Sequence, residues 1–97
     1  MEQPTKERIQ TMIRGGKTTE AIEMLKNLLK GDIPLPNMTQ DECHYLIGNA
    51  YRKNGDWKEA LNSYQKALEI NAESPAKQAR RAVIDILEFY YKDMHNP

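Results

Sequence analysis

Residues 41–71 read DECHYLIGNAYRKNGDWKEALNSYQKALEIN, and they contain two helical patterns with a turn between them. In the first pattern apolar residues recur at three- and four-residue steps, which is the period of a helix that buries one face. Asn54-Gly55 interrupts this pattern, because glycine readily adopts the left-handed conformation that ends helices. The second pattern runs from Trp57 to Ile70. We therefore expect two antiparallel helices joined by a tight turn.

Two more helices are expected upstream of this stretch. Residues 5–14 and residues 18 or 19 to 30 carry apolar side chains at helical spacing. Gly15-Gly16 separates the two segments, and Gly31 follows the second. Residues 32–38 include two prolines, which remove backbone donors and disfavour helix in the residues before them. An extended loop is expected there.

A fifth helix is expected to start at Ser74-Pro75, because serine is a favoured N-cap and proline suits the first helical position. Thr39 or Asp41 is expected to cap the third helix, and Asp56 the fourth. Residues 93–97 are expected to lie beyond the last helix. No segment alternates apolar and polar residues in the manner of a strand, so the fold class is all-α.

The two helix pairs resemble one another. Residues 17–22, KTTEAI, align with residues 56–61, DWKEAL, and both pairs place glycine before the second helix. Self-similarity at this period indicates a helical solenoid. We expect one domain over residues 1–97, with a degenerate first repeat at 4–31, the proline loop at 32–38, a second repeat at 39–72 and a capping helix at 74–92.

The second unit resembles the tetratricopeptide repeat, which places small residues and aromatic residues at fixed steps. Gly48, Tyr51, Ala60, Tyr64 and Ala67 occupy these places. Gly48 and Ala60 would let the two helices approach closely, Tyr51 and Tyr64 would fill the space around that contact, and Ala67 would leave room for the next helix. The resemblance implies a right-handed α-solenoid of two helix hairpins and a C-terminal capping helix. In that helix, Ala82, Val83 and Ile86 would take the packing places.

The composition excludes several classes of function. Among 97 residues, 14 are basic and 14 acidic, so no overall field favours nucleic acid or an anionic membrane. The apolar runs are far shorter than the roughly 20 residues that span a bilayer, and the N-terminal residues lack the apolar core of a signal peptide. Cys43 is the only cysteine, which fits a reducing compartment. A cytoplasmic location is expected.

No catalytic constellation stands out. Gly15-Gly16-Lys17-Thr18 resembles the end of a phosphate-binding loop, but a further glycine is missing at Thr11 and no strand precedes it. Cys43 and His44 are neighbours, so on a helix they point about 100° apart and do not form a nucleophile pair. No spacing of histidine and cysteine suits a metal. We expect no enzyme activity, no cofactor and no metal.

The family resemblance implies a binding groove lined by the first helix of each pair. Carried over residue by residue, the groove positions are Lys6, Gln10, Tyr45, Asn49, Arg52, Lys77, Arg81 and Ile84. This basic and polar set predicts a protein or peptide partner. Some family members clamp a terminal carboxylate, and Lys6, Lys77 and Arg81 fall near the basic clamp places. Gln10 and Leu46 fall where the clamp has asparagine, and because Leu46 cannot donate, the clamp would be partial.

A second candidate surface lies near the C-terminus. Its apolar side chains give the last helix more than one apolar face: Leu87, Phe89, Tyr90 and Tyr91, next to Ile84. Such a helix either packs back on the domain or meets another subunit or a partner. Two functions therefore stay open: an adaptor that binds a peptide in its groove, and a structural module that self-associates through its last helix.

Overall fold

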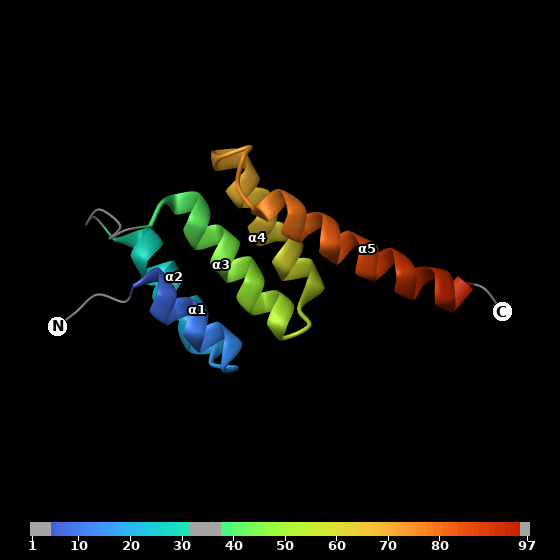
Figure 1. The fold of residues 1–97 in the computed structure, drawn as a ribbon, viewed down its shortest axis with the longest axis horizontal. Coiled ribbons are helices and arrows are strands. Elements are labelled where there is room, and N and C mark those ends of the chain that lie inside the picture. The colour runs from blue at the N-terminus through green and yellow to red at the C-terminus, as the bar shows by residue number, and fades with distance from the viewer. Residues whose placement is uncertain (1–4, 32–37, 96–97) are drawn as a thin grey trace.

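The computed structural model describes residues 5–31 and 38–95, with side chains to Tyr90, and this part of the chain forms five helices. The helices are α1 Lys6–Arg14, α2 Thr18–Lys30, α3 Gln40–Lys53, α4 Trp57–Ile70 and α5 Ala76–His95 (Figure 1). The described residues contain no strand, so the expected all-α repeat fold with five helices is confirmed. Residues 32–37, most of the expected proline loop, lie outside the described part.

The helices form two layers (Figure 1). In the front layer α1 contacts α3 and α3 contacts α5. The back layer consists of α2 and α4, which both pack on α3 but, within the described residues, do not contact each other. A stack whose front helices touch while its back helices are spread apart curves toward α1, α3 and α5.

The α3–α4 hairpin is the most extensively packed pair of helices. A Cβ atom on Gly48 would lie 2.5 Å from Cε1 of Tyr64, so α4 can place a ring here only because residue 48 has no side chain. Tyr64 and Ala60 are fully buried. At the other end of the hairpin, the Asn71 amide donates to Asp41 Oδ2 at 3.2 Å and ties the end of α4 to the start of α3.

The helix ends follow local chemistry. Gly16 and Gly55 have φ angles of 90° and 81°, which other residues rarely adopt. At the start of α3 the Thr39 amide donates to Glu42 Oε1 at 3.3 Å. Asp56 occupies the N-cap position of α4, but in the described structure its side chain makes no cap hydrogen bond. Instead its backbone amide donates to the Tyr51 carbonyl at 2.9 Å and closes the turn.

Two apolar clusters form the core. One joins α1, α2 and α3 around the fully buried Ile9 and Leu25, and the other joins α4 and α5 around Tyr64. Tyr45 and Tyr51 pack against both clusters. A polar contact also joins the repeats, because the Thr18 hydroxyl donates to Asn54 Oδ1 at 2.7 Å.

Cys43 is fully buried in the first cluster. Burial first, and then the charges of Glu42 and Asp41, raise the pKa of its thiol to about 11. A thiol in this state is neither ionised nor accessible at neutral pH, so Cys43 behaves as a small packed residue.

The register of α5 differs in part from the expectation. Val83 is fully buried as expected, but Ala82 and Ile86 are only half-buried. The line that packs on α4 consists of Ala76, Ala79, Val83 and Leu87, at steps of three and four residues. The helix also continues to His95, so residues 93–95 are helical because neither glycine nor proline occurs before Pro97 to end it.

Candidate functional site

The front face of α3 carries three side chains on one side of the helix. Tyr45, Asn49 and Arg52 follow one another at steps of four and three residues, and all three are half-buried. Tyr64 supports them from behind: its ring centroid lies 6.1 Å from that of Tyr45, and its hydroxyl donates to Asn49 Oδ1 at 2.6 Å. Tyr64, a packing residue of the repeat, therefore also positions the side chains of Tyr45 and Asn49 on the front face.

The Tyr64 hydroxyl stays protonated over the whole physiological range. Burial raises the pKa of Tyr64 to about 12, against the opposing influence of the Arg52 charge nearby. In the structure this protonated hydroxyl donates to the carbonyl oxygen of the Asn49 side chain, which orients the amide. The amide nitrogen of Asn49 is then the group left to donate to a ligand.

A hollow lies at the lower end of this face and has a volume of about 420 Å³. Ligand pockets in proteins commonly have volumes of about 300–1,000 Å³. The hollow is lined from four helices: Ile13 and Arg14 of α1, Asn49, Arg52 and Lys53 of α3, Trp57 of α4 and Ile86 of α5. Its charged lining residues are three cations, and Trp57 and Ile86 add apolar surface. This surface, the front groove, comprises these cavity residues together with Tyr45.

Two of the predicted groove cations are paired with acidic residues. Lys6 Nζ lies 2.7 Å from Glu42 Oε2, between α1 and α3. The hydrogen bond between them raises the pKa of Lys6 and lowers that of Glu42. On α5, Arg81 Nε lies 3.2 Å from Asp85 Oδ1 at an exposed position. These pairs reduce the positive charge available to a terminal carboxylate.

The remaining predicted residues are spread over the surface. Gln10 is half-buried on α1, and on α5 Lys77 is exposed while Ile84 is half-buried. Arg81 precedes Ile86 by five residues, so the two side chains point about 140° apart around α5. Because Ile86 lines the front groove, Arg81 points away from it. The structure thus brings together Asn49 and Arg52, but does not bring Lys77 and Arg81 to them.

Several groove residues were not identified from the sequence: Ile13, Arg14, Lys53, Trp57 and Ile86. Arg14 and Lys53 could have been found from the sequence, because each is a basic residue in the last turn of its helix, α1 or α3. The two cations are therefore at equivalent ends of equivalent helices. Trp57 is the single tryptophan and directly follows the turn. Ile86 could be found only once the register of α5 is known.

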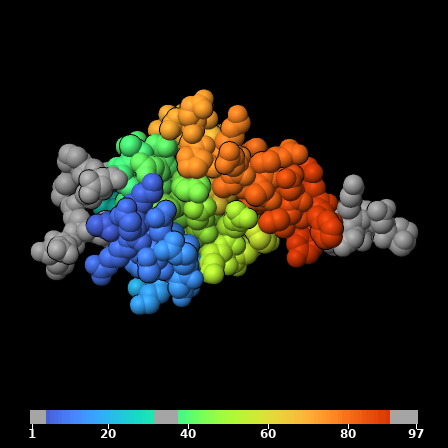
Figure 2. Space-filling model, viewed as in Figure 1, coloured from blue at the N-terminus to red at the C-terminus, as the bar shows by residue number. Residues whose placement is uncertain are grey.

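The C-terminal half of α5 extends past the N-terminal end of α4 (Figures 1 and 2). Phe89 and Tyr90 are 65% and 58% exposed, and their ring centroids are 6.3 Å apart in an edge-to-face arrangement. Leu87, predicted to belong to the same patch, packs against α4 instead. The Tyr91 side chain lies outside the described residues.

Comparisons with known proteins agree with this architecture. A family model for the tetratricopeptide repeat matches residues 42–74. The chain is also similar to a protein of Bacteroides fragilis, BF1650, solved in solution by NMR: the two are 48% identical, the match covers 99% of this chain and 91% of that one, and the TM-score is 0.80. Comparison with curated proteins gave no match.

The chain belongs to the tetratricopeptide repeat family, which confirms the resemblance seen in residues 41–71. Repeats of this family are protein-interaction modules and generally not enzymes. Among the described helices none is both long and apolar enough to cross a membrane. Among the described side chains, no three of the histidine, cysteine, aspartate and glutamate groups are placed to hold a metal ion.

Proposed function

We propose that the front groove binds an acidic segment of a partner polypeptide. The observation that carries this proposal is the charge of its cavity, where Arg14, Arg52 and Lys53 are the charged lining residues of a chain whose net charge is zero. A local excess of cations in a neutral chain favours a ligand of opposite charge. A cytoplasmic partner is part of this proposal, because the single cysteine fits a reducing compartment.

The groove offers a set of contacts suited to a peptide. The Arg52 guanidinium can bind a carboxylate with two parallel hydrogen bonds, which are stronger than neutral ones. Asn49, oriented by Tyr64, can donate to a peptide carbonyl. Trp57 and Ile86 provide apolar surface for one side chain of the ligand. The basic centre of the site is thus proposed at the C-terminal ends of α1 and α3, away from Lys6 and Arg81.

A titration with synthetic peptides tests this proposal. The probe is a short peptide rich in aspartate and glutamate with one central leucine, made with a free and with an amidated C-terminus. Arg52→Glu should weaken binding by roughly tenfold or more, as expected for a lost charge-assisted hydrogen bond. Lys58→Glu is the matched control, because Lys58 is exposed on α4 and its substitution changes the net charge by the same amount as Arg52→Glu.

Amide chemical shifts of the labelled protein locate the site. Shifts at Arg14, Asn49, Arg52 and Ile86 are expected. Equal affinity of wild type and Arg52→Glu, or shifts confined to other surfaces, would refute the proposal. Stronger binding of the free-acid peptide would indicate that a terminal carboxylate is recognised; equal binding would indicate side-chain carboxylates.

Self-association through α5 is a second candidate function, favoured by the exposure of Phe89 and Tyr90. Two adjacent exposed rings on a helix that extends past its neighbour form an apolar surface of the kind found at interfaces. Light scattering across a concentration series tests it. A mass that rises with concentration, and no longer rises in Phe89→Ser/Tyr90→Ser, supports self-association; a constant monomer mass excludes it.

A further inference from the structure

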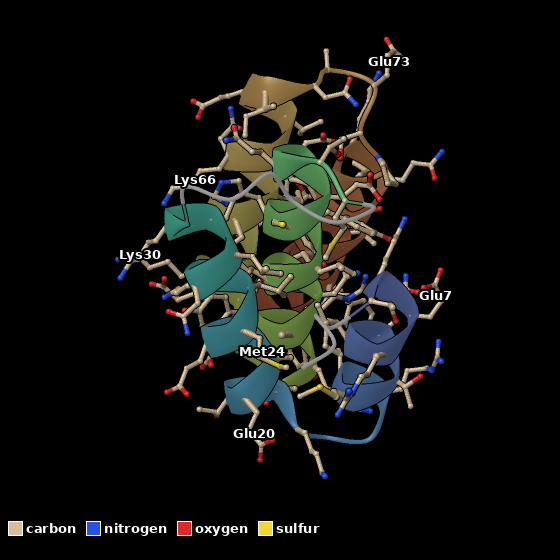
Figure 3. All side chains as sticks on the ribbon, turned by 90° about the vertical axis from the view of Figure 1, so that its left-hand side faces the viewer. Glu7, Glu20, Met24, Lys30, Lys66 and Glu73 are labelled. Carbon is tan, nitrogen blue, oxygen red and sulfur yellow. The ribbon has the colours of Figure 1, made fainter. Side chains whose placement is uncertain are left out.

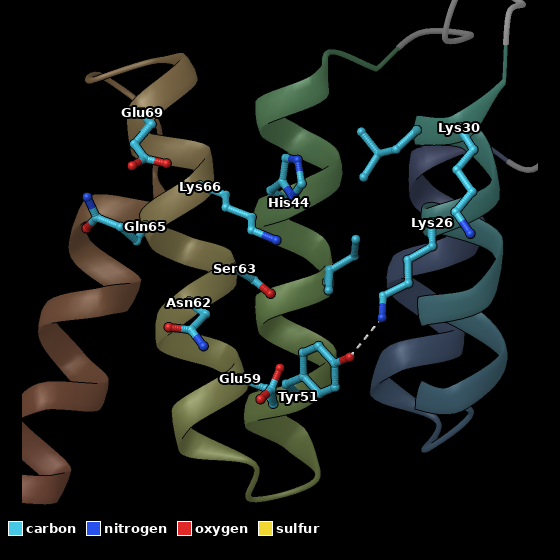
Figure 4. A pocket seen from close by; sticks show the side chains of 12 residues that line it. Lys26, Lys30, His44, Tyr51, Glu59, Asn62, Ser63, Gln65, Lys66 and Glu69 are labelled. Atoms are coloured by element: carbon cyan, nitrogen blue, oxygen red, sulfur yellow. Dashed lines mark hydrogen bonds between the residues drawn. The ribbon is translucent and has the colours of Figure 1, made fainter.

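A second hollow lies on the back of the molecule, between α2 and α4 (Figure 4). It exists because the described parts of these two helices do not contact each other, so the back face of α3 is uncovered between them. Its volume is about 500 Å³. His44, Ile47 and Tyr51 of α3 form its floor. This surface, the back groove, is separate from the front groove and from the groove positions that the family resemblance implies.

The two walls of the back groove differ in charge. The charged lining residues from α2 are Lys26 and Lys30, both cations. The wall from α4 carries Glu59 and Glu69 near its two ends, with Lys66 between them (Figure 4). Lys30 and Lys66 point outward on the same side of the molecule, away from α1 (Figure 3). A ligand that fits both walls therefore presents acidic groups to α2.

The spacing of the α2 lysines indicates the form of the ligand. Lys26 and Lys30 are four residues apart, about 6 Å along the helix axis. The Lys26 side chain is directed toward α3, because its Nζ donates to the Tyr51 hydroxyl at 3.2 Å and lies 5.8 Å from the centroid of that ring. Two carboxylates on a helix are also about 6 Å apart when they occupy positions i and i+4.

The floor between the walls is apolar. Ile47 is only 3% exposed, so the apolar surface open to a ligand is that of the half-buried Leu29 and Tyr51. Burial, and then the charge of Lys66, lower the pKa of His44, so its ring is neutral at neutral pH. A neutral imidazole places no charge on the floor, and the Tyr51 ring adds apolar surface along α3. Such a floor accepts the aliphatic face of an amphipathic helix.

We propose that the back groove binds an amphipathic helix of a partner polypeptide, with two carboxylates one turn apart facing Lys26 and Lys30 and aliphatic side chains on Leu29 and Tyr51. The helix-in-groove mode suits a site with two helical walls and an apolar floor between them. Nucleic acid is disfavoured, because Glu59 and Glu69 would repel phosphates on the opposite wall. This site does not depend on the front groove, so the protein can hold two segments on opposite faces.

A designed helical peptide tests the back groove with the full-length chain. The probe carries glutamate at two positions one turn apart and leucine at the positions that follow them; the control peptide has lysine in place of each glutamate. The probe should shift the amides of Lys26–Lys30 in α2 and of residues 62–69 in α4, whereas the control peptide should not. A front-groove ligand would shift α1 and α5 instead, so failure of one proposal is distinguishable from failure of the other.

Variants of the basic wall complete the test. Lys26→Glu/Lys30→Glu should weaken binding of the probe by roughly tenfold or more, since two charge-assisted contacts become repulsive. Lys26→Gln/Lys30→Gln removes the charge without repulsion and should give a smaller loss, which keeps the test decisive if the first variant unfolds. Lys58→Glu is the control with unchanged affinity. Wild-type affinity in both lysine variants, or no shifts in α2 and α4 at millimolar probe, would overturn the proposal.

Discussion

Replacing Gly48 with alanine places two opposing effects in competition. An alanine in the middle of a helix is more favourable than glycine by about 0.5–1 kcal/mol, so a surface position would gain stability. At position 48, however, the new Cβ would lie 2.5 Å and 2.6 Å from two carbon atoms of the Tyr64 ring. These distances are well inside van der Waals contact, and Tyr64 is fully buried, so its ring has little room to move.

The clash should be the larger effect. Forcing one extra carbon into a well-packed core costs about 1–3 kcal/mol. A displaced Tyr64 ring also weakens the hydroxyl contact with Asn49, which contributes about 1 kcal/mol. After subtracting the gain in helix propensity, Gly48→Ala should lower the free energy of unfolding by about 1–3 kcal/mol.

Urea unfolding followed by circular dichroism measures this difference. With a slope of about 1–3 kcal/mol per molar urea, the midpoint should fall by roughly 1 M. The matched control combines Gly48→Ala with Tyr64→Leu: without the ring, the alanine should no longer destabilise the protein relative to Tyr64→Leu alone. A Gly48→Ala protein that is more stable than wild type would refute the packing argument, because helix propensity alone would then describe the site.

Three further outcomes are expected. Tyr64→Phe should cost about 1 kcal/mol in urea unfolding, because the Asn49 carbonyl loses its donor; unchanged stability would mean that water replaces the hydroxyl. The pKa of Glu42 is lowered by Lys6, so its contribution to stability is present above its ordinary value of 4.5 and is lost as the pH falls through the folded-state pKa. A pH series of urea midpoints should show this slope flattened in Glu42→Gln. Because burial lowers the pKa of His44 from 6.5, the unfolded chain binds more protons just below that pH, and stability should rise with pH up to about 6.5. His44→Gln should remove this rise, and a rise of equal size in that variant would contradict the assignment.

The α3–α4 hairpin could be predicted from the sequence because its determinants are local. Gly48 and Tyr64 are sixteen residues apart in chain order, and a tight turn brings their helices together with little freedom of register. The pattern of small residues and rings therefore specified both the helices and their fold class. The positions of the five helices follow in the same way from apolar periodicity and turn residues.

The composition of the front groove could not be predicted in the same way. Whether Lys6 is available depends on Glu42, a residue in another helix, and no local pattern in the sequence records that pair. The face that α5 turns toward α3 depends on the packing of Val83 and Leu87 against α4. A shift of one residue rotates a helix by about 100°, which is enough to turn Ile86 away from the groove and bring a neighbouring residue of α5 to its place.

Tyr45 and Tyr51, which pack against both apolar clusters, have a consequence for folding cooperativity. In a one-dimensional stack, stability is the sum of the stability of each unit and of the coupling between neighbours. Here two rings on a single helix supply much of that coupling, so neither cluster can open without losing contacts that the other needs. The slowest amide hydrogen exchange should therefore concentrate in α3, with faster exchange toward α1 and the distal end of α5. Both apolar clusters depend on α3. Loss of helical order in α3 should therefore unfold both repeats in one transition.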